Sequence, residues 1–308
     1  MSQLLREHRR TVLRYYNCIG GGQREDRPYQ GKEIEMKTTR KIVFTLFILA
    51  AAAPSAKSDS QASANLPNAQ DILKKSVRAI RGNNEEATYR MRLMAGSREE
   101  GVRTMNLWFK SKTEDDAKLV IKFSEPANIR GTGLLTLHEV GKPLDQWLFL
   151  PAYKKTRRIK GGNESESFLG SDFTMADISV KPATNMDFTT QKKEKCGDLE
   201  CFVIIGKPKA DLDPQSQPYT REVVYVRTDN LLNIKTEFYS KQEDGSEKLE
   251  KVMSMQGIKK DGDVWTVEKI EMKNLLTDHT TFIELVKRDL KKIPADSVFT
   301  QGFLEKGV

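Results

Sequence analysis

The sequence has few of the residues that enzyme active sites and metal centres use most often. Its 308 residues include only 3 His and 3 Cys. His138 and His279 lie on predicted strands, and neither has a Ser or Cys nearby in a nucleophile motif. Asp172 and Asp177 are two carboxylates without the further oxygen ligands that calcium requires. We therefore expect no catalytic activity, no cofactor and no metal site.

Long apolar runs are also absent. The uncharged run "IVFTLFILAAAA" at 42–53 has about a dozen residues, whereas a membrane-spanning helix needs about 20. It follows Met36 and a short basic segment, and it precedes the small-residue sequence "ASA", which ends at residue 64. This order is typical of a secretory signal peptide that is cleaved after export. The pattern predicts that 36–64 is such a signal.

The predicted signal peptide also guides the interpretation of the segments before and after it. Residues 1–35 resemble neither a folded element nor the start of a signal, so we interpret them as an upstream extension from a mis-called start, with Met36 as the initiator. No Cys follows the apolar run closely, so lipid anchoring of the mature N-terminus is not expected. We expect the mature protein to be a single exported domain, residues 65–308.

The net charge of +8 suggests a nucleic-acid partner until it is divided along the chain. Residues 1–64 hold 11 Lys and Arg against 6 Asp and Glu, which leaves 40 against 37 for residues 65–308. The mature part thus carries a net charge of only +3. Its charge balance does not favour nucleic-acid binding.

Two of the three cysteines, Cys196 and Cys201, flank the sequence "GDLE". An even number of Cys in an exported protein indicates a disulfide, and this spacing suits two strands joined by a short turn. A redox motif has a different spacing, and a zinc site would need two further ligands. We expect a structural disulfide.

The mature chain begins with one amphipathic helix, "NAQDILKKSVRAIRG", in which Ile72, Leu73, Val77 and Ile80 share a side. After it, about a dozen short runs alternate between apolar and polar residues, with turn sequences such as "QEDGSEK" and "KKDGD" between them. This pattern predicts an antiparallel meander that is curved and covered by helix on its concave side.

Longer motifs follow in a fixed order along the chain. They include "PANIRGTGLLTLHE", "WLFLPAYKKTRRI" and "SFLGSDFTMADI" between residues 126 and 178, and later "CFVIIGKPK", "YTREVVYVRTDNLLNIKTEFYSKQEDGSEK" and "VFTQGFLEKG". In this order they resemble the LolA-like outer-membrane lipoprotein-sorting proteins over residues 69–308. The resemblance implies an unclosed antiparallel β half-barrel with helices covering the concave face, and a hydrophobic cavity for acyl chains.

The resemblance also implies a function without catalysis. It predicts a periplasmic carrier that binds the acyl chains of lipoproteins or other lipids and shuttles them towards the outer membrane. Its partners would be an inner-membrane exporter of the ABC or RND type and an outer-membrane acceptor, with peripheral rather than integral membrane contact. Two alternatives stay open: a periplasmic sensor or interaction module on the same fold, and a lipid-handling accessory of an RND-type exporter.

Candidate residues for the cavity wall come from the stretch "QWLFL", which is apolar on both faces, and from the sequence that follows it. They are Trp147, Leu148, Phe149, Leu150, Phe168, Phe173 and Met175. Alternation places Trp147 and Phe149 on one face of a strand and Leu148 and Leu150 on the other, and it leaves open which pair faces the cavity.

Five cations directly follow that apolar stretch, and an aspartate lies further on. Lys154, Lys155, Arg157, Arg158 and Lys160 form either a solvated surface or a cationic rim for anionic headgroups or an acidic partner. In "GSDF" we expect Asp172 to cap the turn that begins at Thr174.

Overall fold

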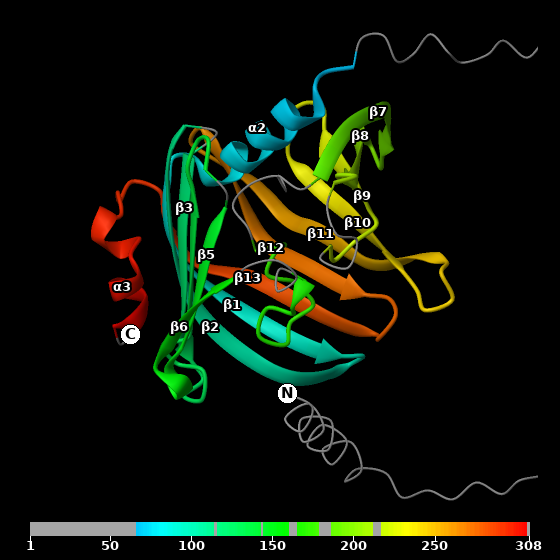
Figure 1. Cartoon of the computed structure of the whole chain (residues 1–308). Coiled ribbons are helices and arrows are strands. Elements are labelled where there is room, and N and C mark those ends of the chain that lie inside the picture. The colour runs from blue at the N-terminus through cyan, green and yellow to red at the C-terminus, as the bar shows by residue number, and fades with distance from the viewer. Residues whose placement is uncertain are drawn as a thin grey trace, which may run out of the picture. The chain divides into compact units, whose positions relative to one another are not determined.

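The structure is a computed structural model that describes residues 66–113, 116–142, 144–159, 165–178, 186–211 and 217–306. The predicted upstream extension and signal peptide lie outside the described residues. In the described part of the chain, thirteen antiparallel strands form one sheet that does not close. Figure 1 shows the sheet curving around an interior, which confirms the predicted half-barrel.

The strands follow the alternating sequence runs. They are β1 (Asn84–Ala95), β2 (Arg98–Thr113), β3 (Asp116–Glu125), β4 (Gly133–His138), β5 (Asp145–Leu150), β6 (Lys155–Ile159), β7 (Met186–Cys196), β8 (Leu199–Pro208), β9 (Arg221–Arg227), β10 (Asn233–Lys241), β11 (Glu247–Asp261), β12 (Val264–Asn274) and β13 (His279–Asp289). In β1 and β2 buried and more exposed residues alternate, whereas β3 and β8 contain runs that are buried on both faces.

The strand order places the two ends of the chain's meander in the middle of the sheet. The order is β6-β5-β4-β3-β2-β1-β13-β12-β11-β10-β9-β8-β7. The first and last strands pair centrally, with Met91 opposite Ile283. Strands β6 and β7 are consecutive in sequence, yet they form the two opposite edges. The connection between them must therefore pass from one edge of the half-barrel to the other.

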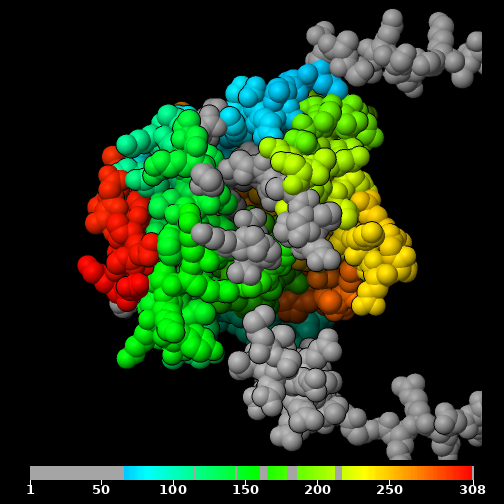
Figure 2. All heavy atoms as spheres, in the orientation of Figure 1, coloured from blue at the N-terminus to red at the C-terminus, as the bar shows by residue number. Residues whose placement is uncertain are grey.

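The long helix α2 (Ala69–Arg81) begins where the sequence predicts it. The side chain of Asn68 caps it by accepting hydrogen bonds from the backbone N–H groups of Gln70 and Asp71, at 2.8 and 3.2 Å. Its apolar side, with Ile72 and Leu73, packs against the interior side chains of β8 and β9. In the space-filling view α2 bridges the two halves of the sheet at one end (Figure 2).

A buried charge network fixes the end of α2 to the sheet. The carboxylate of Glu85 on β1 is fully buried and forms ion pairs with Arg81 of α2 at 2.6 Å and Arg288 of β13 at 3.0 Å. The Tyr89 hydroxyl donates to the same carboxylate at 2.9 Å. Arg288 also donates to the carbonyl of Ile80 in the last turn of α2. Helix, first strand and last strand thus share one buried carboxylate.

We predict that Glu85→Gln lowers the free energy of unfolding by about 3–5 kcal/mol, because it leaves the buried guanidinium of Arg288 without its counter-charge. Glu86→Gln is the matched control, since Glu86 lies on the other side of the same strand and pairs with the exposed Lys292. Urea unfolding of the two variants should show a much larger loss for Glu85→Gln. Equal losses would contradict the role given to this network.

The C-terminal helix α3 (Gln301–Glu305) lies on the outer, convex face of the sheet (Figures 1 and 2). The 3-10 turn η4 (Asp296–Val298) precedes α3, and another 3-10 turn, η1 (Pro151–Tyr153), joins β5 to β6. The ammonium group of Lys122, a residue with 2% of its surface exposed, donates to the carbonyls of Phe303 and Lys306. Burial lowers the pKa of Lys122. This lysine therefore holds the end of α3 against β3.

Cys196 and Cys201 form a disulfide across the turn between β7 and β8, as the sequence predicts. Gly197 takes a φ of 67° in this turn, a conformation that favours glycine. In the described residues, no helix is both long and apolar enough to cross a membrane.

Candidate functional site

The concave side of the sheet carries one large cluster of buried apolar side chains. Its side chains come from strands on both sides of the sheet, so β1 to β6 and β10 to β13 contribute to the same buried cluster. Leu148 of β5 belongs to it with 2% exposure, and Leu150 packs against it. The structure thus resolves the alternative that the sequence left open, because Leu148 and Leu150 face inward.

Trp147 and Phe149 lie on the opposite face of β5. Phe149 is buried with Leu304 of α3, and Trp147 packs against the same outer cluster. The outer face therefore uses these two aromatic residues to seat α3, and they do not line the concave surface. The stretch is apolar on both faces because both faces of β5 are covered.

The concave surface is covered by the segment 165–178, which is part of the connection between β6 and β7. Phe168, Phe173 and Met175 project from it into the apolar cluster, with exposures of 0%, 3% and 2%. The segment turns back on itself, and the N–H of Phe168 donates to the carbonyl of Phe173 at 2.7 Å. We call this segment the plug. The apolar side chains of the sheet beneath the plug are therefore buried.

Asp172 ties the plug to the centre of the sheet. Its carboxylate accepts a hydrogen bond from the hydroxyl of Thr281 at 2.6 Å and lies 2.7 Å from Nδ1 of His279, both on β13. The expectation that Asp172 caps the turn at Thr174 was wrong. The Thr174 N–H instead donates to Asp177 at 2.7 Å, because Asp172 is already engaged with the sheet.

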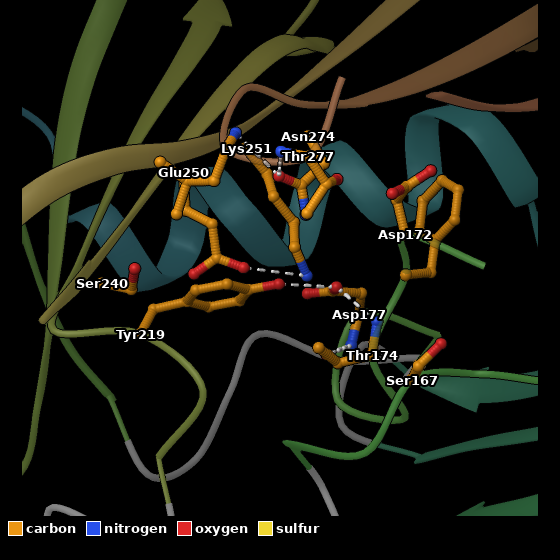
Figure 3. A network of polar contacts seen from close by, with 12 residues as sticks. Ser167, Asp172, Thr174, Asp177, Tyr219, Ser240, Glu250, Lys251, Asn274 and Thr277 are labelled. Atoms are coloured by element: carbon orange, nitrogen blue, oxygen red, sulfur yellow. Dashed lines mark hydrogen bonds and ion pairs between the residues drawn. The ribbon is translucent and has the colours of Figure 1, made fainter. Parts of the chain in front are cut away.

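A second polar contact lies under the other end of the plug (Figure 3). Asp177 accepts a hydrogen bond from the hydroxyl of Tyr219 at 2.8 Å. Lys251 of β11, 7% exposed, points its ammonium group toward this pair and lies 5.5 Å from the ring centre of Tyr219. Burial raises the pKa of Asp177, although the hydrogen bond from Thr174 and the charge of Lys251 oppose this shift. Burial and Asp177 also raise the pKa of Tyr219.

Glu222 of β9 completes the charged groups in this part of the interior. Burial, together with the charge of Asp177, raises the pKa of Glu222 to about 8. Its carboxyl group is thus mostly protonated near neutral pH.

The sequence-based prediction did not include the polar residues of the interior, although the sequence pattern indicates two of them, Glu222 and Lys251. In "REVVYV", Glu222 shares a face with Val224 and Val226, and in "KVMSM" Lys251 shares a face with Met253. A charged residue that interrupts an apolar face is unusual, and such residues are often functional or paired. Tyr219 lies before β9 and carried no comparable signal.

The predicted cationic rim is partly neutralised. Arg157 pairs with Glu166 of the plug at 2.5 Å. Arg158 pairs with Asp145 and lies over the ring of Trp147. Lys154 and Lys155 are exposed. Lys160 lies outside the described residues. The rim stays a prediction, and Arg157 and Arg158 are exposed as well as the two lysines.

A cleft of about 410 Å³ lies near the ends of β2 to β4, but lysine and acidic side chains dominate its lining, which does not suit an acyl chain. Across the described ranges, no group of three or more His, Cys, Asp or Glu residues is placed to hold a metal ion.

A curved, unclosed sheet with a covered apolar interior defines a class of protein, and solved structures of that class are similar to this chain. An outer-membrane lipoprotein-sorting protein domain from Vibrio parahaemolyticus is 26% identical with a TM-score of 0.65, and the match covers 77% of this chain and 98% of that one. A DUF1329 family protein from Desulfovibrio piger is 23% identical with a TM-score of 0.64, covering 76% and 97%. A LolA superfamily protein from Nitrosomonas europaea is 20% identical with a TM-score of 0.60, covering 77% and 100%.

These similarities confirm the LolA-like resemblance that the motifs predicted. A family model described as "Uncharacterized protein" matches residues 115–306, and the chain belongs to this family. Among curated proteins, no sequence matches the chain.

We predict that Glu222→Gln stabilises the protein increasingly as the pH rises. The folded state holds the Glu222 proton more tightly than the unfolded state, so this stability is complete below about pH 4.5 and is lost towards about pH 8. Glutamine stays neutral, so the difference in unfolding free energy between variant and wild type should grow by up to roughly 1.4 kcal/mol per pH unit.

Urea unfolding at a series of pH values measures this difference. Glu243→Gln, at an exposed turn position, is the control and should give a flat difference. A flat difference for Glu222→Gln as well would show that this carboxyl group titrates normally.

Proposed function

We propose that the protein is a periplasmic carrier that binds acyl chains on the concave face of its half-barrel and shuttles them towards the outer membrane. One observation carries the proposal: a single apolar cluster spans both halves of the sheet, and a turn-rich segment contributes to it and covers it. An acyl chain in water costs about 0.8 kcal/mol per exposed CH2 group, so a carrier must bury several such groups. The similar sorting domain from Vibrio parahaemolyticus supports this class of cargo.

The proposal assigns separate roles to the two groups of interior residues. Leu148 and Leu150 form part of the fixed wall, because they belong to the sheet. Phe168, Phe173 and Met175 are the side chains that give way, because they belong to the plug. The plug keeps the apolar wall out of water until cargo arrives, and it does so through contacts that an acyl chain can replace.

The cellular setting is part of the same proposal. Residues 36–64 direct export, and residues 65–308 act as one domain in the periplasm. Cargo comes from an inner-membrane exporter of the ABC or RND type and passes to an outer-membrane acceptor, with the exposed Lys154 and Lys155 available to anionic headgroups. The family resemblance supports these partners, and the apolar interior favours carriage over sensing.

The test is mass spectrometry of organic extracts from residues 65–308, purified without detergent from a periplasm. We expect a reproducible acyl species at near-stoichiometric amounts. Leu148→Asn should lose it, because a polar amide then lies in the wall. Leu135→Asn is the matched control, since Leu135 is equally buried on the neighbouring strand but faces outward.

Both variants must first show cooperative thermal unfolding. Equal lipid retention in the two folded variants would contradict the concave wall as the binding surface. A well-folded wild-type protein that also fails to bind added acyl lipids would contradict the carrier function itself.

A further inference from the structure

The plug places apolar side chains in the interior and, further along the chain, a carboxylate. Phe168, Phe173 and Met175 enter the apolar cluster, and two residues further along the chain the carboxylate of Asp177 meets Tyr219. An apolar group followed by an acidic group is also the chemical outline of a fatty acid or a lysophospholipid. The residues that contact Asp177 from the sheet side are therefore candidates for binding the acidic group of such a lipid.

Two groups near Asp177 can bind an anion and do not belong to the plug: the hydroxyl of Tyr219 and the ammonium group of Lys251. The Tyr219 hydroxyl donates to Asp177, and the Tyr219 ring packs on Phe238 of β10 at 4.6 Å between centres. Lys251 extends from β11 with its ammonium group directed at the same carboxylate (Figure 3). A buried ammonium group is costly without a nearby negative charge. The ammonium group of Lys251 pairs with Glu250 at 3.5 Å, which is a long contact.

Two other acidic groups lie near this pair. While the plug is in place, burial and the charge of Asp177 raise the pKa of Glu222 to about 8, so this carboxyl group carries little charge near neutral pH. Glu250 is engaged with Lys251. When the plug leaves, Asp177 and the N–H of Thr174 leave with it, and Lys251 and Tyr219 remain in the interior.

We propose that Lys251 and Tyr219 form a binding site for the acidic headgroup of an acyl lipid, a carboxylate or a phosphate, and that Asp177 occupies this site as an internal substitute for that headgroup. The inference rests on the proposed carrier function and narrows its cargo to acidic lipids. The plug then competes with cargo at two places: its apolar side chains occupy the apolar cluster, and its carboxylate occupies the headgroup site. An uncharged lipid can replace only the first of these contacts.

The experiment measures equilibrium binding to residues 65–308 near neutral pH with two matched lipid pairs. Palmitate is compared with hexadecanol, and palmitoyl lysophosphatidic acid with monopalmitoylglycerol, so that each pair differs mainly in its acidic group. We expect the wild-type protein to prefer the acidic member of at least one pair by about tenfold or more, as a charge-assisted hydrogen bond implies. The pair that shows the preference identifies the headgroup as carboxylate or phosphate.

Three variants test the residues. Lys251→Met keeps the aliphatic stem and should abolish the preference for the acidic member of the pair. Tyr219→Phe keeps the ring and should reduce the preference. Asp177→Asn should raise the affinity for the acidic lipid, because the competing charge is removed. Lys248→Met, at an exposed position of the same strand, is the control and should behave as wild type.

The outcomes separate this inference from the carrier function. If none of the four lipids binds to the wild-type protein, the carrier function fails and this inference fails with it. If all four bind without preference, the carrier function stands and the headgroup site is wrong. A preference that persists in folded Lys251→Met and Tyr219→Phe also overturns the site. If Lys251→Met does not fold, unchanged preference in both Tyr219→Phe and Asp177→Asn overturns it.

Discussion

The structure depends on one topological constraint: β6 and β7 follow each other in the chain but form the two free edges of a curved sheet. The chain between them has to pass from edge to edge, and its described part lies across the concave face. That face is apolar and must be covered in water. A connection that the topology requires thus serves as the cover, and α2 closes one end with the help of the buried Glu85 network.

The two faces of the sheet are covered in different ways, and the difference has a functional meaning. On the convex face, α3 is held by Trp147 and Phe149 and by a buried lysine, Lys122, that binds its last carbonyls. On the concave face, the plug inserts three apolar side chains and attaches through Asp172 and Asp177. The convex cover packs into an apolar cluster of its own, whereas the concave cover combines apolar and acidic contacts of the kinds that an acidic lipid can make.

The sequence was sufficient for local structure and for the class of fold. Apolar periodicity predicted α2, alternation predicted the strands, and the spacing of Cys196 and Cys201 predicted their disulfide. Alternation could not assign the faces of Trp147–Leu150, because both faces are buried and only the position of α3 distinguishes them. Nor could local pattern show that Asp172 binds β13, since that contact joins residues more than a hundred positions apart. Interior Glu222 and Lys251 were detectable as charges on apolar faces.

The central claim is that the plug leaves the concave surface when an acyl chain binds there. Hydrogen–deuterium exchange with and without bound palmitate tests it most directly, because the N–H groups of Phe168, Ser171 and Met175 are hydrogen-bonded within the plug. The account predicts that these amides exchange faster when lipid is bound, while those of the central strands β1 and β13 do not. Unchanged or slower exchange in the plug, with lipid demonstrably bound, would contradict the account.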